Sequence, residues 1–191
     1  MLRFPFVLRD LDAFKGTISM DLPEPFDTLE ANALAKARHV FKQIGLPVFA
    51  EDSGLFVPAL GYAPGVYSAR FAARGSERPS KDANMRLLLD NMEGVQDRSA
   101  VFKAAMAFVS AELCPQGCLF YGACQGHITE QIQSTQGFGY DAVFTPQGYD
   151  KTFAELGAMV KNNISHRKKA LESLLKYLRS QKNILDLQTK K

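Results

Sequence analysis

The feature that most constrains the fold is a short apolar run that ends at two acids. Leu46-Pro47-Val48-Phe49-Ala50 is followed at once by Glu51-Asp52-Ser53-Gly54. The apolar run predicts a short buried strand that stops at the acids. In α/β proteins, functional side chains gather beyond the carboxyl ends of strands, where carboxylates can hold a metal ion or act as a base. Gly54 would allow a sharp turn and the close approach of a ligand. A polar turn after a structural strand fits the same residues equally well.

Helices are predicted on both sides of this strand. The first runs from Asp27, which has capping-box spacing with Glu30, to about Ile44, and Gly45 ends it. The second is capped by Ser80 and reaches about Met92. The last begins at Ser165 and carries an apolar stripe at helical spacing that consists of Ala170, Leu171, Leu174, Leu175 and Leu178.

Further apolar segments predict strands. Residues 100–109 are apolar on both faces and lie between turn signals, which favours a buried strand over a helix. Residues 118–124 and 127–133 predict two more strands, joined near Gly126.

Composition limits the classes of function. The chain has 191 residues, of which 46% are hydrophobic and 23% charged, which is ordinary for one globular domain or one two-lobed domain. A net charge of +3 is too small to indicate a nucleic-acid partner. No apolar run of about 18 residues is present to span a membrane. The three cysteines form no zinc pattern and leave an odd thiol, so we expect a reducing compartment and a cytoplasmic protein.

Four groups of residues could carry chemistry. The carboxylates of Glu24, Glu51 and Asp52 could surround Mg²⁺, which proteins hold with one or two carboxylates, waters and substrate phosphates. A loop over residues 65–70 ends in a cation. A glycine-rich loop over residues 138–141 presents two aromatic rings and an acid. Residues 161–167 place cationic and proton-carrying groups beside a helix N-terminus, which favours anions.

Each of these groups also has a structural interpretation. Lys36 is typical of a solvated lysine on a helix. His166 is typical of a capping or surface histidine, and Phe138 of a core residue. Taken singly, none of them indicates a function more strongly than a structural role.

Together, the motifs resemble the inosine triphosphate pyrophosphatase family, in their order along the chain. The resemblance runs from about Asp21 to Leu178. It is carried by Asp-Ser-Gly-Leu at 52–55, Ala-Pro-Gly-Val-Tyr-Ser-Ala-Arg at 63–70, Phe-Gly-Tyr-Asp at 138–141, Thr-Phe-Ala-Glu-Leu at 152–156 and Ser-His-Arg at 165–167.

The resemblance implies a fold and a reaction. The fold would be α/β, with a mixed central sheet flanked by helices and two lobes with an active-site cleft between them. Residues 1–181 would form this single domain and residues 182–191 a polar tail. The reaction would be Mg²⁺-dependent hydrolysis of inosine, deoxyinosine and xanthosine triphosphates to the monophosphate and pyrophosphate. The resemblance also implies a homodimer.

The resemblance assigns roles to individual residues. Asp52 would be the catalytic acid that binds metal and activates water, and Glu24 would be a second metal ligand. Lys36 and Arg70 would face the phosphates, and Ser53 would touch the substrate. Phe138 would stack on the base, with Gly139, Tyr140 and Asp141 completing that wall. Lys161, His166 and Arg167 would bind the purine edge and hold the nucleotide.

The chain departs from the family pattern at its beginning. Family members start with a strand and a Thr/Ser-x-Asn-x-x-Lys loop that holds the triphosphate. This sequence contains no such motif, so we expect that about 25 residues of the family pattern are absent. We therefore expect a gap or an open edge in the sheet. A catalytically silent or weakened nucleotide-binding relative is the alternative function. Smaller departures are Glu51 in place of a common Asp and Ala142 in place of a frequent Pro.

Overall fold

The computed structural model describes residues 7–16, 18–19, 22, 24–73 and 79–188, with the backbone alone for residues 182–188. Two compact units can be distinguished in it. Unit 1 comprises residues 1–52, 105–121 and 170–191, and unit 2 comprises residues 53–104 and 122–169. Three of the strands contribute residues to both units.

The α/β class is confirmed, with one sheet in the order β2-β1-β3-β4-β5. Its strands are β1 (Val48–Phe56), β2 (Pro64–Gly65), β3 (Ser99–Ser110), β4 (Cys114–Ile128) and β5 (Phe144–Pro146). β1 and β2 pair antiparallel, and so do β4 and β5. The three-residue connection between the neighbours β3 and β4 also requires antiparallel pairing. These three pairs contain none of the parallel neighbours that a mixed sheet would include.

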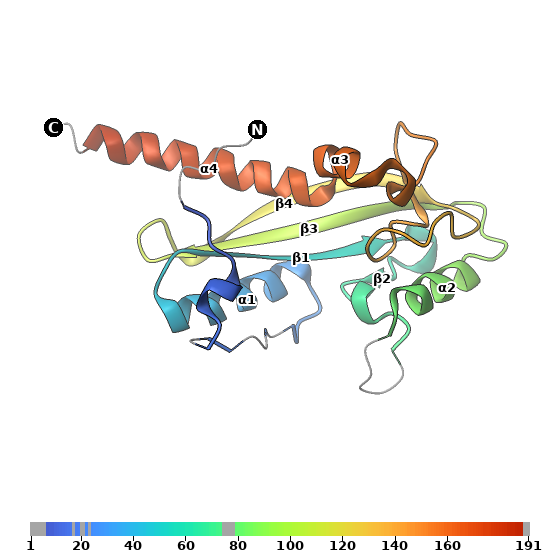
Figure 1. The fold of residues 1–191 in the computed structure, drawn as a ribbon, viewed down its shortest axis with the longest axis horizontal. Helices are drawn as coiled ribbons and strands as arrows, with labels where there is room; N and C mark the ends of the chain where they lie inside the picture. Colours follow the sequence, from blue (N-terminus) through green and yellow to red (C-terminus); the bar gives the residue numbers. More distant parts are fainter. Residues whose placement is uncertain (1–6, 17, 20–21, 23, 74–78, 189–191) are drawn as a thin grey trace. The chain divides into compact units, whose positions relative to one another are not determined.

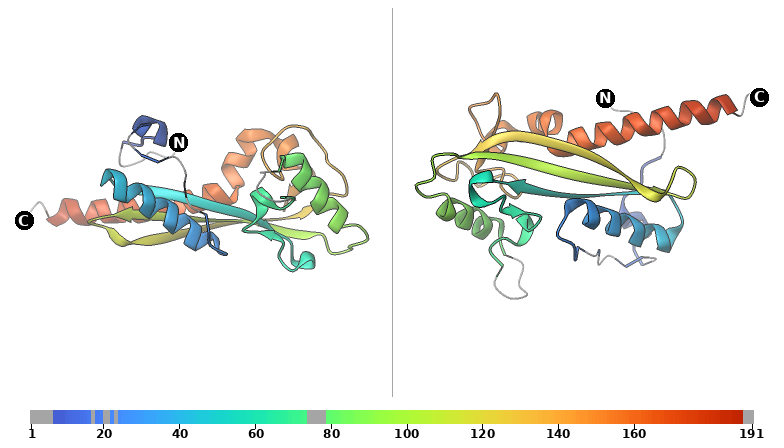
Figure 2. Two further views of the ribbon diagram at one scale, coloured as in Figure 1. Left: turned by 90° about the horizontal axis from the view of Figure 1, so that it is seen from below. Right: turned by 180° about the vertical axis from the view of Figure 1, so that it is seen from behind.

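Helices cover the strands within each unit. α1 (Leu29–Ile44) and the part of α4 (His166–Gln188) in unit 1 lie on opposite faces of the strands there, as Figures 1 and 2 show. Unit 2 contains α2 (Lys81–Asn91) and α3 (Phe153–Ile164). Short 3-10 turns at Leu11–Phe14, Pro58–Leu60 and Ser68–Arg70 complete the described elements.

The first helix matches its predicted range but has a different cap. The hydroxyl of Thr28, and not the carboxylate of Asp27, accepts the backbone N–H of Ala31, at 3.2 Å. Gly45 ends the helix as predicted, in the left-handed conformation that favours glycine. The cap therefore lies one residue later than predicted. The side chains of Asp27 and Thr28 can both supply the oxygen that an N-cap needs, so the sequence did not distinguish them.

The strand at the acids is longer than predicted. β1 runs through Glu51, Asp52, Ser53 and Gly54 to Phe56, so the acids lie inside the strand and not at its end. The predicted turn at Gly54 was wrong. A Cβ atom on Gly54 would lie 2.2 Å from the backbone oxygen of Gly65, so this glycine allows β2 to approach β1.

A second glycine was misread in the same way. The two strands predicted over residues 118–124 and 127–133 are the single strand β4, and residues 129–133 lie beyond it. Gly126 does not turn the chain. A Cβ atom there would lie 2.2 Å from the backbone oxygen of Thr145, so the glycine lets β5 pair with β4.

The helices of the second half show one confirmed cap and two differences. Ser80 caps α2 and accepts the N–H of Ala83 at 3.1 Å, as predicted. α3 was not predicted, although Thr152 and Glu155 form a capping box at its start. α4 continues to Gln188, where the sequence predicts a tail from residue 182, and residues 189–191 lie outside the described part.

An aromatic cluster forms the centre of the unit 2 core. Phe144 and Phe153 are fully buried, and their ring centroids lie 5.4 Å apart. Phe102 packs edge-on against Phe144 at 4.6 Å. Around them lie buried aliphatic side chains from β1, α2 and β4, among them Leu55, Leu88 and Ile128. The core therefore fixes the strand and helix ends from which the loops of unit 2 begin.

The cysteines differ from the prediction, which was a protein of a reducing compartment. Cys114 and Cys118 form a disulfide, while Cys124 is free and buried. The Tyr177 hydroxyl lies 3.2 Å from the Cys114 sulfur and donates to the carbonyl of Leu113, also at 3.2 Å. The odd thiol is therefore Cys124. Among the described residues, no helix combines the length and apolarity needed to cross a membrane.

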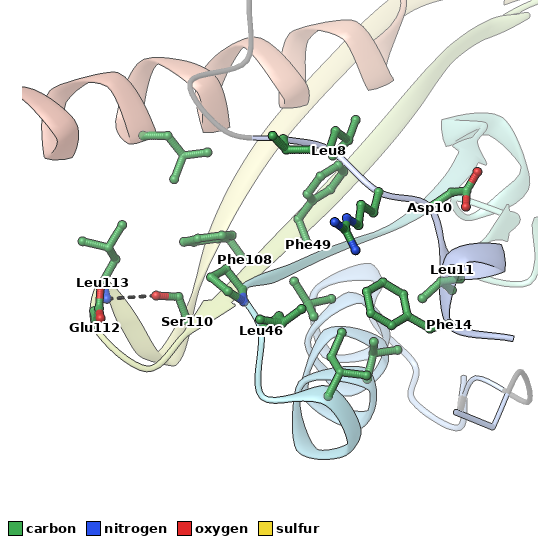
Figure 3. Close-up of a pocket in the computed structure, with 17 residues that line it drawn as sticks. Leu8, Asp10, Leu11, Phe14, Leu46, Phe49, Phe108, Ser110, Glu112 and Leu113 are labelled. Atoms are coloured by element: carbon green, nitrogen blue, oxygen red, sulfur yellow. Dashed lines mark hydrogen bonds between the residues drawn. The ribbon is translucent and has the colours of Figure 1, made fainter. Parts of the chain in front are cut away.

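Unit 1 contains an apolar cavity of about 600 Å³. Figure 3 shows Phe14, Phe49 and Phe108 among the side chains that surround it. The few polar groups at its edge include Ser110, whose hydroxyl accepts the N–H of Leu113 at 3.1 Å. The cavity is therefore a hydrophobic space beside the first residues of β1.

Candidate active site

In unit 1, one buried lysine joins two carboxylates. The Lys36 ammonium donates to Glu24 Oε1 at 2.8 Å and to Asp52 Oδ1 at 2.9 Å. Lys36 lies on α1 and is only 7% exposed, while Asp52 lies in β1. We call Glu24, Lys36 and Asp52 the acid–lysine cluster. The structure thus brings these three predicted residues together.

Asn32 supports this cluster and was missed at the sequence level. Its side-chain amide donates to Asp52 Oδ2 at 3.3 Å and to the carbonyl of Phe26 at 3.0 Å, while its oxygen accepts the N–H of Phe26 at 2.9 Å. Asn32 and Lys36 are four residues apart and therefore lie on one face of α1. A polar residue one turn before a site lysine is the signal that could have identified it.

Burial and pairing change the proton affinity of both buried groups in the cluster. Burial is the largest influence on Lys36 and would lower its pKa, but the hydrogen bonds and charges of Glu24 and Asp52 together outweigh it, so the Lys36 pKa is raised. Burial raises the pKa of the Asp52 carboxyl, and the opposing effect of Lys36 does not cancel this. Lys36 is therefore a cation at neutral pH, and Asp52 is a stronger proton acceptor than an exposed aspartate.

The donor set fits a magnesium ion bound together with substrate. One oxygen of Glu24 and one of Asp52 converge on the same cation, the Lys36 ammonium. Two carboxylates are a common protein contribution to Mg²⁺ sites, where waters and phosphates complete the octahedron. Within the described ranges, no three His, Cys, Asp or Glu side chains converge as a metal site, so Glu51 does not join Glu24 and Asp52. Alternation along β1 directs Glu51 and Asp52 to opposite faces.

In unit 2, an exposed aromatic ring lies beside an arginine. Phe138 is 68% exposed, and the Arg167 guanidinium carbon lies 5.5 Å from its ring centroid. Arg167 also donates from Nη2 to the Ser53 hydroxyl at 3.1 Å. The exposure of Phe138 rules out the core role that its residue type favours. Phe138, Arg167 and Ser53 form what we call the ring–arginine cluster.

The loop that carries Phe138 is held from within by an ion pair. Asp141 is only 4% exposed, and its Oδ2 accepts the backbone N–H of Phe138 at 3.0 Å. The Lys161 ammonium donates to both oxygens of Asp141, at 2.8 and 2.6 Å. Asp141 and Lys161 therefore fix the loop, which differs from the direct substrate contacts that the resemblance assigns to them.

Tyr140 is also a structural residue of this loop. Its ring is buried, and its hydroxyl donates to the carbonyl of Ser68 at 2.9 Å. Burial raises the pKa of this hydroxyl far above its ordinary value. Ser68 in turn donates to the carbonyl of Gly65 at 2.6 Å and accepts the N–H of Leu55. Tyr140 thus links the 138–141 loop to the 65–70 loop, where Arg70 lies over the ring of Tyr67 at 5.0 Å.

His166 is buried and uncharged. It is 3% exposed, and its imidazole is stacked on Phe102 with centroids 4.8 Å apart and planes 10° apart. Burial, assisted by the charges of Arg167, Lys161 and Lys169, lowers the pKa of His166 to about 3. Its Nδ1 atom is buried without a hydrogen-bond partner among the described residues. His166 is therefore neutral at physiological pH and is neither the surface histidine nor the cationic contact that the sequence suggested.

The predicted residues thus fall into two clusters, one in each unit. Asp52 and Ser53 are consecutive residues of β1, so the chain itself connects the acid–lysine cluster to the ring–arginine cluster. Gly139 lies in the Phe138 loop with a left-handed backbone, for which glycine is suited. Arg70 lies in the 3-10 turn Ser68–Arg70 of unit 2.

Comparisons with known proteins agree with the family resemblance that the motifs indicate. Residues 3–177 match the family described as the Ham1 family. The dITP/XTP pyrophosphatase of Flavobacterium johnsoniae is 42% identical over 175 residues, which are 92% of this chain and 85% of that protein. The dITP/XTP pyrophosphatase of Porphyromonas gingivalis is 44% identical over 160 residues, 83% of this chain and 79% of that protein.

Solved structures show the same likeness. The Ham1 protein of Staphylococcus aureus superposes with a TM-score of 0.77 at 34% sequence identity, and the match covers 85% of this chain and 82% of that one. The HAM1 protein of Coxiella burnetii gives a TM-score of 0.76 at 38% identity, over 84% of this chain and 81% of that one.

Proposed function

Because the chain belongs to the Ham1 family, we propose that it hydrolyses non-canonical purine nucleoside triphosphates to the monophosphate and pyrophosphate. The substrate class comes from the relatives named dITP/XTP pyrophosphatases, which match 83–92% of this chain. The structural observation that carries the proposal is the acid–lysine cluster, in which the partly buried Asp52 and the exposed Glu24 share the buried ammonium of Lys36. Such a cluster supplies both the negative and the positive groups that a phosphate-cleaving site needs.

Asp52 would act on the attacking water. Its carboxylate would orient the water and accept its proton as the water oxygen bonds to the α-phosphorus and the bond to the α–β bridging oxygen breaks. The raised pKa of Asp52 suits this role, because a base accepts protons better as its pKa approaches the working pH. The proton would then pass to solvent, and pyrophosphate would leave with its electron pair.

Lys36 would stabilise the negative charge of the phosphates. Its ammonium is fixed by Glu24 and Asp52 and remains charged, so it needs no rearrangement of solvent to act on a phosphate oxygen. Mg²⁺ would be held by Glu24 and Asp52 and, when bound, would neutralise phosphate charge. Arg70 is proposed as a second phosphate contact, on the resemblance of its motif.

The ring–arginine cluster would select the base. The exposed Phe138 ring offers a stacking surface for a purine, and the Arg167 guanidinium beside it offers donors only. Hypoxanthine and xanthine carry an oxygen at position 6, which accepts such a donor. Adenine carries an amino group there, which cannot accept a hydrogen bond from the guanidinium, and such a mismatch at a donor disfavours the wrong substrate strongly.

Three further assignments complete the proposal. They are Mg²⁺ as the cofactor, a homodimer as the assembly and the cytoplasm as the location. The family resemblance supports the first two, and the convergence of Glu24 and Asp52 gives the first a structural basis as well.

Product analysis in ¹⁸O-labelled water tests the reaction. We expect dITP with Mg²⁺ to give the monophosphate and pyrophosphate, with the label in the monophosphate, because attack is at the α-phosphorus. Asp52→Asn should slow product formation by roughly 10²–10⁴-fold. Glu51→Gln, at the neighbouring acid outside the acid–lysine cluster, should retain it. Release of inorganic phosphate, or label in pyrophosphate, would show that a different reaction is catalysed.

A further inference from the structure

Helix α2 contacts two of the loops that carry proposed site residues, and it does so through one face. Lys81 and Asn84 are three residues apart, which places them on the same side of the helix. Lys81 reaches the loop before Phe138, and Asn84 reaches the loop around Arg70. All of these residues belong to unit 2.

We infer that α2 is a positioning element for the nucleotide site, in which Lys81 fixes the Phe138 loop and Asn84 fixes the Arg70 turn. Neither residue would touch the substrate, and each would act through the loop that it holds. The roles of Phe138 and Arg70 rest on the proposed function, whereas the clamping itself is independent of the reaction.

Lys81 holds the Phe138 loop from its outer side. Its ammonium donates to the carbonyl of Thr135 at 2.8 Å and to that of Gly137 at 3.4 Å. Lys81 is exposed, and an exposed lysine on a helix usually extends into solvent, so two carbonyl contacts from one ammonium are a specific arrangement. Residues 134–137 belong to no helix or strand, and this segment therefore depends on such contacts for its position.

Lys81 and Asp141 hold consecutive residues of the Phe138 loop. Lys81 binds the carbonyl of Gly137, and Asp141 binds the N–H of Phe138, so the same peptide unit is held on both sides. Gly137 has a left-handed backbone, and a Cβ atom there would lie 2.8 Å from that of Asp141. The loop is thus tightly placed at the point from which the exposed Phe138 ring projects.

Asn84 holds the Arg70 turn with both ends of its amide. Its oxygen accepts the N–H of Ala72 at 2.8 Å, and its nitrogen donates to the carbonyl of Ala69 at 3.3 Å. These two residues flank Arg70 and Phe71 in the chain. Asn84 is only 5% exposed, so its amide has little access to water and is committed to these two contacts. It therefore fixes the backbone from which the Arg70 side chain extends.

Fluorescence can test the Lys81 clamp without any enzyme assay. The chain contains no tryptophan, so Phe138→Trp places a single reporter on the loop. In this background we expect Lys81→Met to lower the steady-state anisotropy of the reporter and Lys81→Arg to restore it. Arg86→Met, at an exposed position of the same helix, is the matched control and should leave it unchanged. Equal anisotropy in the Lys81→Met and parent proteins would overturn the clamp, whether or not the chain hydrolyses nucleotides.

Kinetics separate the two positioning roles. With Phe138 intact, Lys81→Met should raise KM for dITP and reduce the preference for dITP over dATP by about tenfold, since misplacement of a binding group costs up to about 10²-fold. Asn84→Asp keeps the acceptor and removes the donor to Ala69, so it should raise KM for both nucleotides equally. A fall in kcat alone, or a loss of selectivity in Asn84→Asp but not in Lys81→Met, would contradict the inference. If the parent chain lacks activity, the proposed function fails, and the anisotropy result still decides on the clamp.

Discussion

At His166, burial removes the charge that the amino-acid type would otherwise supply. The Ser-His-Arg motif contains a proton-carrying imidazole, but burial against Phe102 lowers the pKa of His166 to about 3 and keeps it neutral at physiological pH. His166 therefore contributes packing and an uncharged ring behind the ring–arginine cluster. Its charge state should be visible in the pH dependence of stability.

The depressed pKa of His166 predicts acid destabilisation. In the unfolded chain the imidazole takes up a proton below about pH 6.5, whereas the folded protein resists protonation down to about pH 3. The contribution of the neutral imidazole to the free energy of unfolding is complete above pH 6.5. It is lost as the pH falls from 6.5 towards 3, by up to about 1.4 kcal/mol per pH unit.

Urea unfolding at a series of pH values measures this effect. The free energy of unfolding of the wild-type protein should fall more steeply between pH 6.5 and 4 than that of His166→Phe, which keeps the aromatic packing and cannot take up a proton. His127→Gln, at an exposed position, should follow the wild-type curve. Parallel curves for wild type and His166→Phe would contradict a buried neutral imidazole.

The sequence identified residue types better than it identified their roles. Glu24 and Asp52 were predicted to lie around one metal ion and Lys36 to face the phosphates. The ion pairs that join Lys36 to both acids depend on packing between α1 and β1, which no local pattern records. The family resemblance assigns Asp141 and Lys161 to the substrate site, and the structure adds that they form an ion pair with each other. Asn32, Lys81 and Asn84 escaped notice because a single amide or lysine on a helix is unremarkable until its partner is known.

At the scale of elements, glycines explain the two differences in strand length between prediction and structure. Gly54 and Gly126 were interpreted as turns, and both lie where a neighbouring strand approaches the backbone. Sequence alone does not distinguish the two uses, because a turn and a close approach both require the absence of a side chain. Helices were predicted more accurately, since Ser80 and Gly45 mark their ends locally.

The close approach at Gly54 predicts a large effect of one methyl group. Gly54→Ala would place a Cβ atom 2.2 Å from the backbone oxygen of Gly65 and 3.1 Å from the Ser68 hydroxyl. We expect a loss of roughly 1–3 kcal/mol in the free energy of unfolding, which is typical of overpacking. β2 should be displaced, and with it the turn that carries Arg70.

A matched substitution separates steric from conformational cost. Gly94→Ala has open space around the new methyl group, and only its left-handed backbone opposes the change. It should cost about 1 kcal/mol, the lower end of the penalty for a residue with a Cβ atom in the left-handed conformation. If chemical unfolding shows that Gly54→Ala is as mild as Gly94→Ala, then β2 does not pack on Gly54 as the structure describes.

At the scale of the whole molecule, the triphosphate has to be held by fixed donors. The sequence contains no Thr/Ser-x-Asn-x-x-Lys loop, and the described part of unit 1 has an apolar cavity beside the first residues of β1. One preorganised donor at a developing charge is worth on the order of 10²–10³ in rate.

Joining a strand and such a loop to the first residue of this sequence tests how far the residues present hold the phosphates. We expect pyrophosphate release from dITP to rise by about 10²-fold or more, since at least one phosphate donor is added. The melting temperature should also rise, because an added strand can pack against apolar side chains of unit 1 such as Leu46, Val48 and Phe108. Equal, high activity of the original and extended chains would show that other residues hold the phosphates.

The central claim is that the acid–lysine cluster performs the hydrolysis and the ring–arginine cluster selects the base. The most direct test is kcat/KM for dITP and for dATP, measured by pyrophosphate release in the wild type, Asp52→Asn and Arg167→Ala. We predict that Asp52→Asn lowers kcat/KM by roughly 10²–10⁴-fold for both nucleotides and leaves their ratio unchanged. Arg167→Ala should lower kcat/KM about tenfold for dITP and hardly at all for dATP, since only the 6-oxo base loses a donor. A changed ratio in Asp52→Asn, or equal losses for both nucleotides in Arg167→Ala, would contradict this division of roles.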